Sequence, residues 1–227
     1  MLLGVAQVVL NVADLDPAAQ ALAAGGYRRS FIERAIPNHP AKGALQARPR
    51  ERLDMVHFAG PAQTVAVEVT SYDSGPPAGR AAFEVELPPP EGASLRVTVL
   101  AGDAQGSLAF WRDALGFRET GDGALALRAL RPEWSLAVQL QPAAEGGPTT
   151  VDAQGCVLVT FLATELERDL ARICDGGLLL RSTPAWEEFI DGRALRVAML
   201  EGPSGELIEL IQLPRRGTPS ERQDENA

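Results

Sequence analysis

Cysteine, histidine and lysine are scarce in this 227-residue sequence. It has two cysteines and two histidines, and Lys42 is the only lysine among its 21 basic Lys and Arg residues. Cys156 and Cys174 lack the paired spacing of a zinc or redox motif, and they fit buried thiols in a reducing compartment. Two histidines exclude a three-histidine metal centre built from one chain.

Positive charge and long apolar runs are also missing. The formal net charge is −9, from 21 Lys and Arg against 30 Asp and Glu. An acidic chain without a basic patch binds nucleic acid or an anionic membrane poorly, so we expect neither partner. No apolar run is long enough for a membrane-spanning helix, and the N-terminus has no signal-peptide pattern. We therefore expect a cytoplasmic protein, and the Arg-, Ala- and Gly-rich composition is typical of a bacterial genome of high GC content.

What the sequence does contain is a pattern of strand, short helix and further strands that occurs three times. Each copy opens with a β-branched strand, and each helix stops at glycine. The first helix follows the capping residue Asp14 and stops at Gly25. The opening strands of the three copies are expected at residues 7–12, 95–100 and 156–161.

The copies and the proline-rich stretches between them predict the domain organisation. Residues 1–73 are expected to form a divergent βαβββ half-domain, and residues 74–93 a proline-rich linker with one extra strand at Phe83–Leu87. Residues 94–213 are expected to form a complete two-module domain, and the polar residues 214–227 a disordered tail.

Two segments carry a family resemblance. Phe110–Phe117 (FWRDALGF) resembles the helix-end signature of the vicinal oxygen chelate superfamily, which includes glyoxalases, bleomycin-resistance proteins and dioxygenases. Gly202–Leu210 (GPSGELIEL) resembles its closing turn and last strand. The resemblance implies an α+β fold in which repeated βαβββ modules form a curved mixed sheet around a small-molecule cleft.

The resemblance also identifies four positions at which metal-dependent relatives carry His or Gln on a first strand and Glu on a last strand. In residues 94–213 these positions hold Arg96, Gln139, Val157 or Leu158, and Glu209. Arginine stays protonated and an aliphatic side chain has no donor atom, so neither binds a metal ion. We therefore expect a metal-free site without a cofactor. Arg96 would then be the counter-ion of Glu209 in one cleft, or the anchor of an anionic ligand.

Gln7 and Glu68 match the metal-dependent pattern better. They are the candidate ligands if a divalent metal ion binds at all, although one module supplies only this pair. The alternative is a polar pair that is hydrogen-bonded across neighbouring strands.

Aromatic and polar residues near the expected cleft are further ligand-binding candidates. Thr98 lies on the cleft-facing phase of its strand, and Trp186 and Phe189 lie in a loop-like stretch where they could stack on a planar ligand. Trp111 is expected in the core. Four more residues are interpreted as structural or solvated positions: the histidines His39 and His57, and the acidic pair Glu187 and Glu188.

Three functions remain open. The first is a small-molecule-binding protein of the glyoxalase/bleomycin-resistance type that sequesters an antibiotic or related metabolite. The second is a metal-dependent lyase, isomerase or dioxygenase, and the third is a metal-independent enzyme with Glu209 or Glu68 as base. Because three modules leave one without an internal mate, we also expect a homodimer, unless the strand at Phe83–Leu87 covers the free sheet edge internally.

Overall fold

The computed structural model describes residues 1–61, 64–73, 79, 81–87, 95–121, 123–127, 129, 131–143, 149–175 and 181–213. The expected tail and most of the proline-rich linker lie outside these residues. Within the described part of the chain, no helix has the length and apolarity needed to cross a bilayer.

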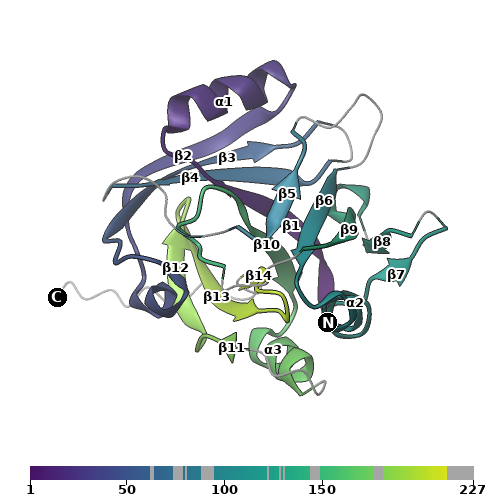
Figure 1. Ribbon diagram of the computed structural model, residues 1–227. Helices are drawn as coiled ribbons and strands as arrows, with labels where there is room; N and C mark the ends of the chain where they lie inside the picture. The colour runs from purple at the N-terminus through teal and green to yellow at the C-terminus, as the bar shows by residue number, and fades with distance from the viewer. Residues whose placement is uncertain are drawn as a thin grey trace.

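The first unit follows the predicted order. Helix α1 lies on the outer side of strands β2–β4 (Figure 1). It is capped as expected by Asp14, whose side chain accepts a hydrogen bond from the amide of Asp16 at 3.1 Å. A 3-10 helix, η1, lies in the connection between β2 and β3. The elements are β1 (Leu2–Asn11), α1 (Leu15–Ala24), β2 (Arg28–Pro37), η1 (Pro40–Leu45), β3 (Arg52–Ala59) and β4 (Ala66–Tyr72).

The second unit follows a short extra strand in the linker region. Its helix continues as a π-helical turn, which contains the first five residues of the FWRDALGF segment. The elements are β5 (Phe83–Val85), β6 (Arg96–Ala101), α2 (Ala104–Ala109), the π-helical turn (Phe110–Ala114), β7 (Arg118–Glu119), β8 (Leu125–Leu127), a 3-10 turn (Pro132–Trp134) and β9 (Leu136–Pro142).

The third unit contains one element that differs from expectation. The stretch around Trp186 and Phe189 is a strand, β12, and not a loop. It pairs antiparallel with β13 along its whole length, which satisfies the backbone groups on that side of the strand. The elements are β10 (Gly155–Ala163), α3 (Leu166–Cys174), β11 (Arg181–Ser182), β12 (Trp186–Ile190), β13 (Arg193–Glu201) and β14 (Leu207–Gln212).

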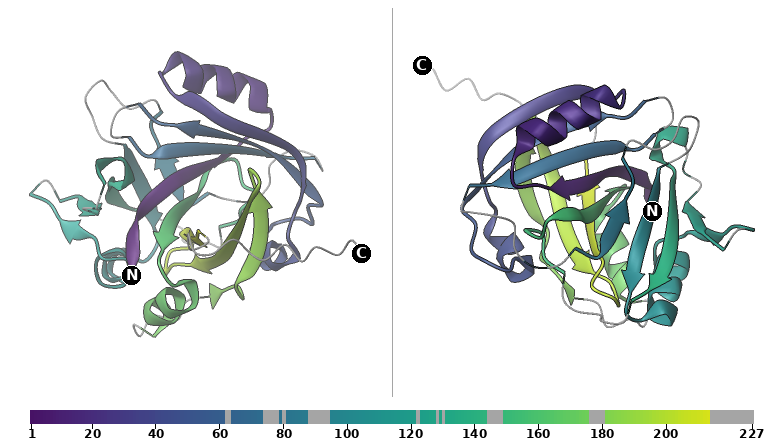
Figure 2. Two further views of the ribbon diagram at one scale, coloured as in Figure 1. Left: turned by 180° about the vertical axis from the view of Figure 1, so that it is seen from behind. Right: turned by 45° about the horizontal axis from the view of Figure 1, so that its top comes forward.

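The sheet joins the first unit to the third. Strand β1 pairs antiparallel with β10, and each is also parallel to the last strand of its own unit, β4 and β14. The purple β1 and the green β10 lie side by side in Figure 2. The cleft expected between the second and third units is therefore formed by the first and third. Every residue of β10 after Gly155 is buried, as expected for a strand at the centre of a sheet.

Strand β5 separates the second unit from this pair. It bonds to β10 at one residue, Cys156, and to β6 along its length. The edge of β6 that faces β10 is thus covered internally, which was the alternative to pairing with a second copy.

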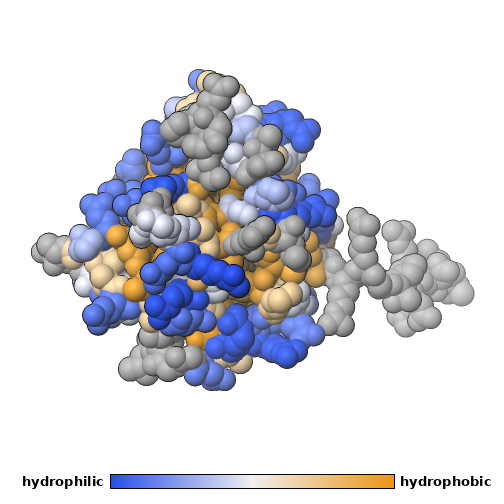
Figure 3. All heavy atoms as spheres, turned by 90° about the vertical axis from the view of Figure 1, so that its right-hand side faces the viewer, coloured by the Kyte–Doolittle hydropathy of each residue, from blue (hydrophilic) through white to orange (hydrophobic). Residues whose placement is uncertain are grey.

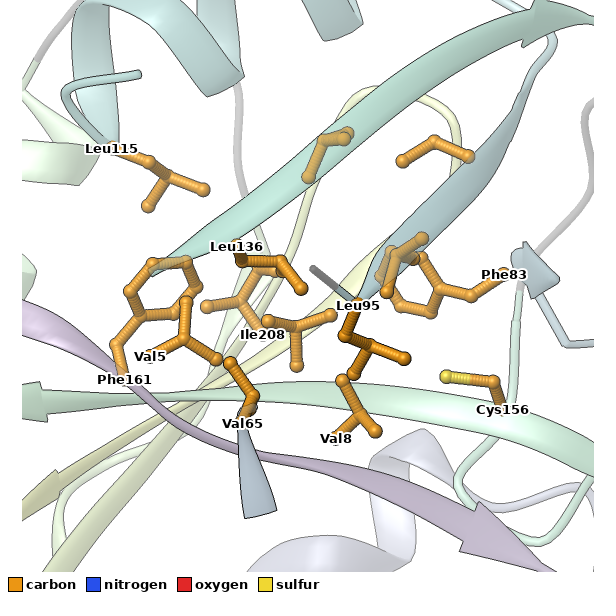
Figure 4. Close-up of a cluster of buried hydrophobic side chains, with 14 of the residues drawn as sticks. Val5, Val8, Val65, Phe83, Leu95, Leu115, Leu136, Cys156, Phe161 and Ile208 are labelled. Atoms are coloured by element: carbon orange, nitrogen blue, oxygen red, sulfur yellow. The ribbon is translucent and has the colours of Figure 1, made fainter. Parts of the chain in front are cut away.

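The aromatic side chains of the FWRDALGF segment pack in the core. Trp111 is fully buried, as predicted, and contacts the rings of Phe110, Phe117 and Phe161 at centroid distances of 5.1–6.4 Å. Figure 4 shows part of the same cluster, in which Phe161 of β10 lies among aliphatic side chains of all three units. This segment therefore marks the core, where aromatic contacts contribute beyond the area that they bury.

The closing turn ties the second unit to the third. The Glu206 carboxylate accepts hydrogen bonds from the amide of Ser204 at 2.7 Å and from the hydroxyl of Ser107 in α2. All three residues are buried. The Gly202–Leu210 segment therefore contains the start of β14 and also links the third unit to helix α2 of the second unit by hydrogen bonds.

Candidate functional site

A cavity of about 230 Å³ lies between the first and third units. Strands β1–β4 and the helix η1 line one side, and β10 and β12–β14 line the other. Most lining side chains are apolar, and the polar ones carry carboxyl, ammonium, guanidinium, amide, imidazole, hydroxyl and phenol groups. These polar residues include Gln7, Lys42, His57, Glu68, Tyr72, Glu188 and Glu209.

The pairing register settles which residues occupy the four positions identified from the resemblance. Val9 faces Glu68 across β1 and β4, so Gln7 lies two residues before the partner of that glutamate. In the third unit Thr160 faces Glu209, so the residue two positions earlier is Leu158. The four positions of this cleft therefore hold Gln7, Glu68, Leu158 and Glu209.

Three of these side chains, those of Gln7, Glu68 and Glu209, carry oxygen atoms of the kind that can bind a metal ion. The amide of Gln7 donates from Nε2 to Oε2 of Glu68 at 2.7 Å, and the hydroxyl of Thr160 donates to Oε2 of Glu209 at 2.9 Å. The hydrogen-bonded polar pair expected for Gln7 and Glu68 is thus present. It lies in the same cavity as Glu209, which comes from the other unit.

An ammonium group shares this cavity with the carboxyl groups. Nζ of Lys42 lies 2.9 Å from Oε1 of Glu188, and both side chains are nearly buried. The indole of Trp186 donates to the other oxygen of Glu188 at 3.3 Å. Lys42 also interacts electrostatically with Glu209 and Glu68.

Burial and mutual repulsion change the protonation of the carboxyl groups. Burial, with added repulsion from Glu209, raises the pKa of Glu68 to about 8. Burial likewise raises the pKa of Glu209 to about 7, although the Lys42 ammonium opposes this rise. Burial alone would lower the pKa of Lys42, but Glu188 and Glu209 raise it above its ordinary value. At neutral pH the site therefore holds a lysine ammonium and at least one protonated carboxyl group.

Two further polar side chains of the lining, His57 and Tyr72, are uncharged at neutral pH. His57 stacks on Phe31 with a centroid distance of 5.0 Å, and burial lowers the pKa of its imidazole. Burial raises the pKa of Tyr72 to about 12. Both side chains are thus neutral at pH 7 and serve as hydrogen-bonding groups rather than charges.

Three sequence candidates lie elsewhere. Arg96 is exposed on β6, and its guanidinium contacts the side-chain oxygen of Gln139 on β9 at 3.4 Å. These two residues and Thr98 belong to the second unit and do not line the cavity of Glu209. The prediction that Arg96 and Glu209 share a cleft is wrong, because β10 pairs with β1 and is separated from β6 by β5.

The two aromatic candidates on β12 also differ from expectation. Trp186 is 7% exposed and stacks on the ring of His39, with a centroid distance of 5.2 Å. Phe189 is 68% exposed and points to the opposite face of the strand. Neither lines the cavity, so a stacking role for them has no support from their positions.

Sequence reasoning missed Lys42, Glu188, His57 and Tyr72. Two signals were available. Lys42 is the only lysine, and Glu188 has the same strand phase as Trp186 and Ile190, which identifies an inward-facing carboxylate once this segment is treated as a strand. The interpretation of Glu188 as part of a solvated face is therefore wrong, whereas its neighbour Glu187 is exposed as expected.

The donor set does not fit a divalent metal ion. Leu158 replaces the fourth ligand, and the Lys42 ammonium interacts with both carboxylates that would have to bind the metal. In the described residues, no three His, Cys, Asp or Glu side chains are arranged to hold a metal ion. A cation already present among these carboxylates repels a second one.

Comparison with solved structures identifies the fold. Glyoxalase I from Zea mays matches over 92% of each chain, with 12% sequence identity and a TM-score of 0.56. A variant of the same enzyme matches over 92% of each chain, with 14% identity and a TM-score of 0.59. Methylmalonyl-CoA epimerase from Mycobacterium tuberculosis matches more weakly, with 13% identity, a TM-score of 0.44 and coverage of 94% of this chain and 89% of that chain.

No family model matches the sequence, and no curated protein matches it. The structural matches show the vicinal oxygen chelate fold that the two sequence segments predict.

Proposed function

We propose that this chain, which has the vicinal oxygen chelate fold, is a small-molecule-binding protein of the glyoxalase/bleomycin-resistance type that works without a metal ion. One observation carries the proposal. The cavity at the position of the family cleft has apolar walls, but Leu158 stands at the fourth ligand position and Lys42 lies among its carboxyl groups. Such a cavity binds an organic molecule by burial of apolar surface.

The charges in the cavity narrow the ligand class. Four acidic side chains, those of Glu68, Glu188, Asp191 and Glu209, line the cavity together with two basic ones, those of Lys42 and Arg193. The raised pKa values of Glu68 and Glu209 indicate that this buried site disfavours negative charge, and the same penalty opposes the binding of an anionic ligand. The ligand is therefore a mainly apolar molecule that is neutral or cationic.

A matched set of probes tests this class. The probes are 1-naphthalenemethanol, 1-naphthylmethylamine and 1-naphthoate, which share an apolar body and differ in charge. We expect the alcohol and the amine to raise the melting temperature and to give measurable heats of binding, and the carboxylate to do neither. Binding of none of them, or preferential binding of 1-naphthoate, would contradict the proposal.

A cavity-filling variant provides the control. Ile211→Trp places a large side chain in the cavity and should abolish binding of the alcohol. Phe189→Ala changes an exposed side chain of similar apolar character and should leave binding unchanged. Circular dichroism of both variants checks that each is folded.

A second candidate function is metal-independent proton transfer. It is favoured by Glu68 and Glu209, whose pKa values near neutral pH suit a general base in an apolar cavity. The ionised carboxylate would remove a proton from the carbon next to a carbonyl group and return it to the same carbon. The test is exchange of deuterium from D2O into 2-tetralone, followed by NMR, in the unmodified protein and in Glu209→Gln. Exchange at the uncatalysed rate would rule this function out.

We further propose a homodimer that uses the second unit, and no nucleic-acid partner. Figure 3 views the side of the molecule on which β6–β9 lie, and hydrophobic residues are visible there between polar ones. Strand β5 covers the β6 edge of this unit, but β7 ends the strand order and no fourth unit pairs with it in the described chain. Light scattering at micromolar concentration should give twice the 24.1 kDa mass of one chain, and a monomeric mass would count against the dimer.

A further inference from the structure

The connection between β2 and β3 reaches across the cleft to the third unit. It spans residues 38–51 and contains η1. The amide of Val151 donates to the carbonyl of Leu45 at 2.9 Å, and the amide of Ala47 donates to the Asp152 carboxylate at 2.7 Å. Arg50 forms a completely buried ion pair with the same carboxylate, with an N–O distance of 3.1 Å. These contacts hold the connection in one place against the segment that precedes β10.

The same connection places the side chain of Lys42 in the cavity. His39 caps η1 by accepting a hydrogen bond from the amide of Ala41 at 3.2 Å, and its ring stacks on Trp186. Nζ of Lys42 lies 5.9 Å from the centre of the Trp186 ring and 2.9 Å from Glu188. The side chain of Lys42 and the residues on both sides of it, His39 and Leu45, are therefore held by contacts to the third unit and the segment before it.

We propose that the Lys42 ammonium is a tethered cation, which replaces the metal ion of this fold among the side chains of Gln7, Glu68 and Glu209. The proposal rests on the metal-free function proposed above and names the group responsible for it. It also assigns a role to the connection between β2 and β3, which places a positive charge from the first unit beside carboxylates of both units.

The chemistry of the site supports a permanent charge. Carboxylates buried in an apolar cavity need a counter-charge, and a lysine ammonium is a compact point charge with three donors. The surrounding carboxylates raise the pKa of Lys42, so the amine stays protonated and is not a nucleophile. This ammonium interacts electrostatically with both Glu209 and Glu68, so it would repel a divalent ion that entered between them.

Four proteins test the proposal: the unmodified chain, Leu158→His, Lys42→Met, and the double variant. Leu158→His supplies the missing fourth ligand, and Lys42→Met removes the charge while keeping an unbranched side chain. We expect Ni²⁺, measured by titration calorimetry, to bind the double variant roughly 100-fold or more tightly than it binds Leu158→His alone. Lys42→Arg combined with Leu158→His keeps the charge and should bind Ni²⁺ as weakly as Leu158→His.

Equal Ni²⁺ affinity in Leu158→His and in the double variant would overturn the proposal. Binding of 1-naphthalenemethanol to each variant separates this result from failure of the proposed function. If the alcohol binds the unmodified chain while Ni²⁺ affinity is independent of Lys42, the tethered cation is refuted and the binding function stands. If the alcohol binds none of the proteins and Ni²⁺ affinity still depends on Lys42, the proposed binding function is refuted and the tethered cation stands.

A measurement on the unmodified protein does not depend on the folding of any variant. Because the chain has one lysine, labelling with ¹⁵N-lysine gives a single side-chain ammonium signal. We expect this signal to exchange slowly with water and to keep its intensity when equimolar Mn²⁺ is added. Loss of the signal through paramagnetic broadening by equimolar Mn²⁺ would place a metal ion beside Lys42 and overturn the proposal.

Discussion

Replacing Glu68 by glutamine should stabilise the protein at alkaline pH and leave its stability nearly unchanged at acidic pH. The pKa of Glu68 rises from an ordinary value of 4.5 to about 8 in the folded protein. Between these values the unfolded chain is ionised while the folded chain keeps the proton, so stability falls as pH rises. The penalty is absent below pH 4.5 and complete above pH 8.

The size of the effect follows from that rise. At ~1.4 kcal/mol for each pH unit, a change from 4.5 to about 8 corresponds to a penalty of ~5 kcal/mol. Glu68 faces the cavity and is only partly buried, and water in the cavity reduces the penalty. We therefore expect Glu68→Gln to gain about 2–3 kcal/mol at pH 8.5 and less than ~0.5 kcal/mol at pH 4.5. The substituted amide oxygen can still accept the hydrogen bond from Gln7.

Urea unfolding at several pH values measures this gain. The matched control is Glu187→Gln on β12, where the exposed carboxylate should give a difference near zero at every pH. An equal gain for Glu68→Gln at pH 4.5 and pH 8.5 would refute the reasoning, because it would show that ionisation of Glu68 is not the source. A loss at pH 8.5 would show that the carboxylate stabilises the folded state through Lys42.

Three further substitutions have defined outcomes. Asp152→Ala leaves the buried guanidinium of Arg50 without this carboxylate, and should cost about 3–5 kcal/mol of unfolding free energy in a urea titration. Gly4→Ala should lower the melting temperature, since Gly4 has φ +151° and a Cβ there would lie 2.7 Å from the Cβ atoms of Ala129 and Trp134. Arg96→Leu should leave binding of 1-naphthalenemethanol unchanged in calorimetry, whereas a tenfold loss would place Arg96 at the ligand.

The fold could be predicted from the sequence because its signals are local. Capping by Asp14 and the β-branched opening strands mark the units, and each depends on neighbours along the chain. The FWRDALGF segment joins a helix to the core through Trp111, and the closing turn places Glu206 against Ser107. Such short segments keep their form wherever the unit docks, so they indicate the fold of each unit but not the pairing of the units.

The pairing of units was decided by tertiary structure. Strand alternation correctly turned Gln7, Glu68 and Glu209 toward a cleft, but alternation does not say which units share it. The prediction paired neighbours in the chain and put Arg96 beside Glu209. In the folded protein β5 lies between β10 and β6, so β10 is free to pair with β1 and brings Glu209 to Gln7 and Glu68.

Lys42 shows why the site itself was beyond the sequence. It lies in an irregular connection, where no periodicity indicates the direction of a side chain, and its partner Glu188 is 146 residues away. The sequence determined that this chain has one lysine and that the four expected positions lack a full set of metal ligands. Only the docking of residues 38–51 on the third unit decided that the ammonium of this lysine lies among buried carboxylates, because long-range contacts of that kind leave no local pattern.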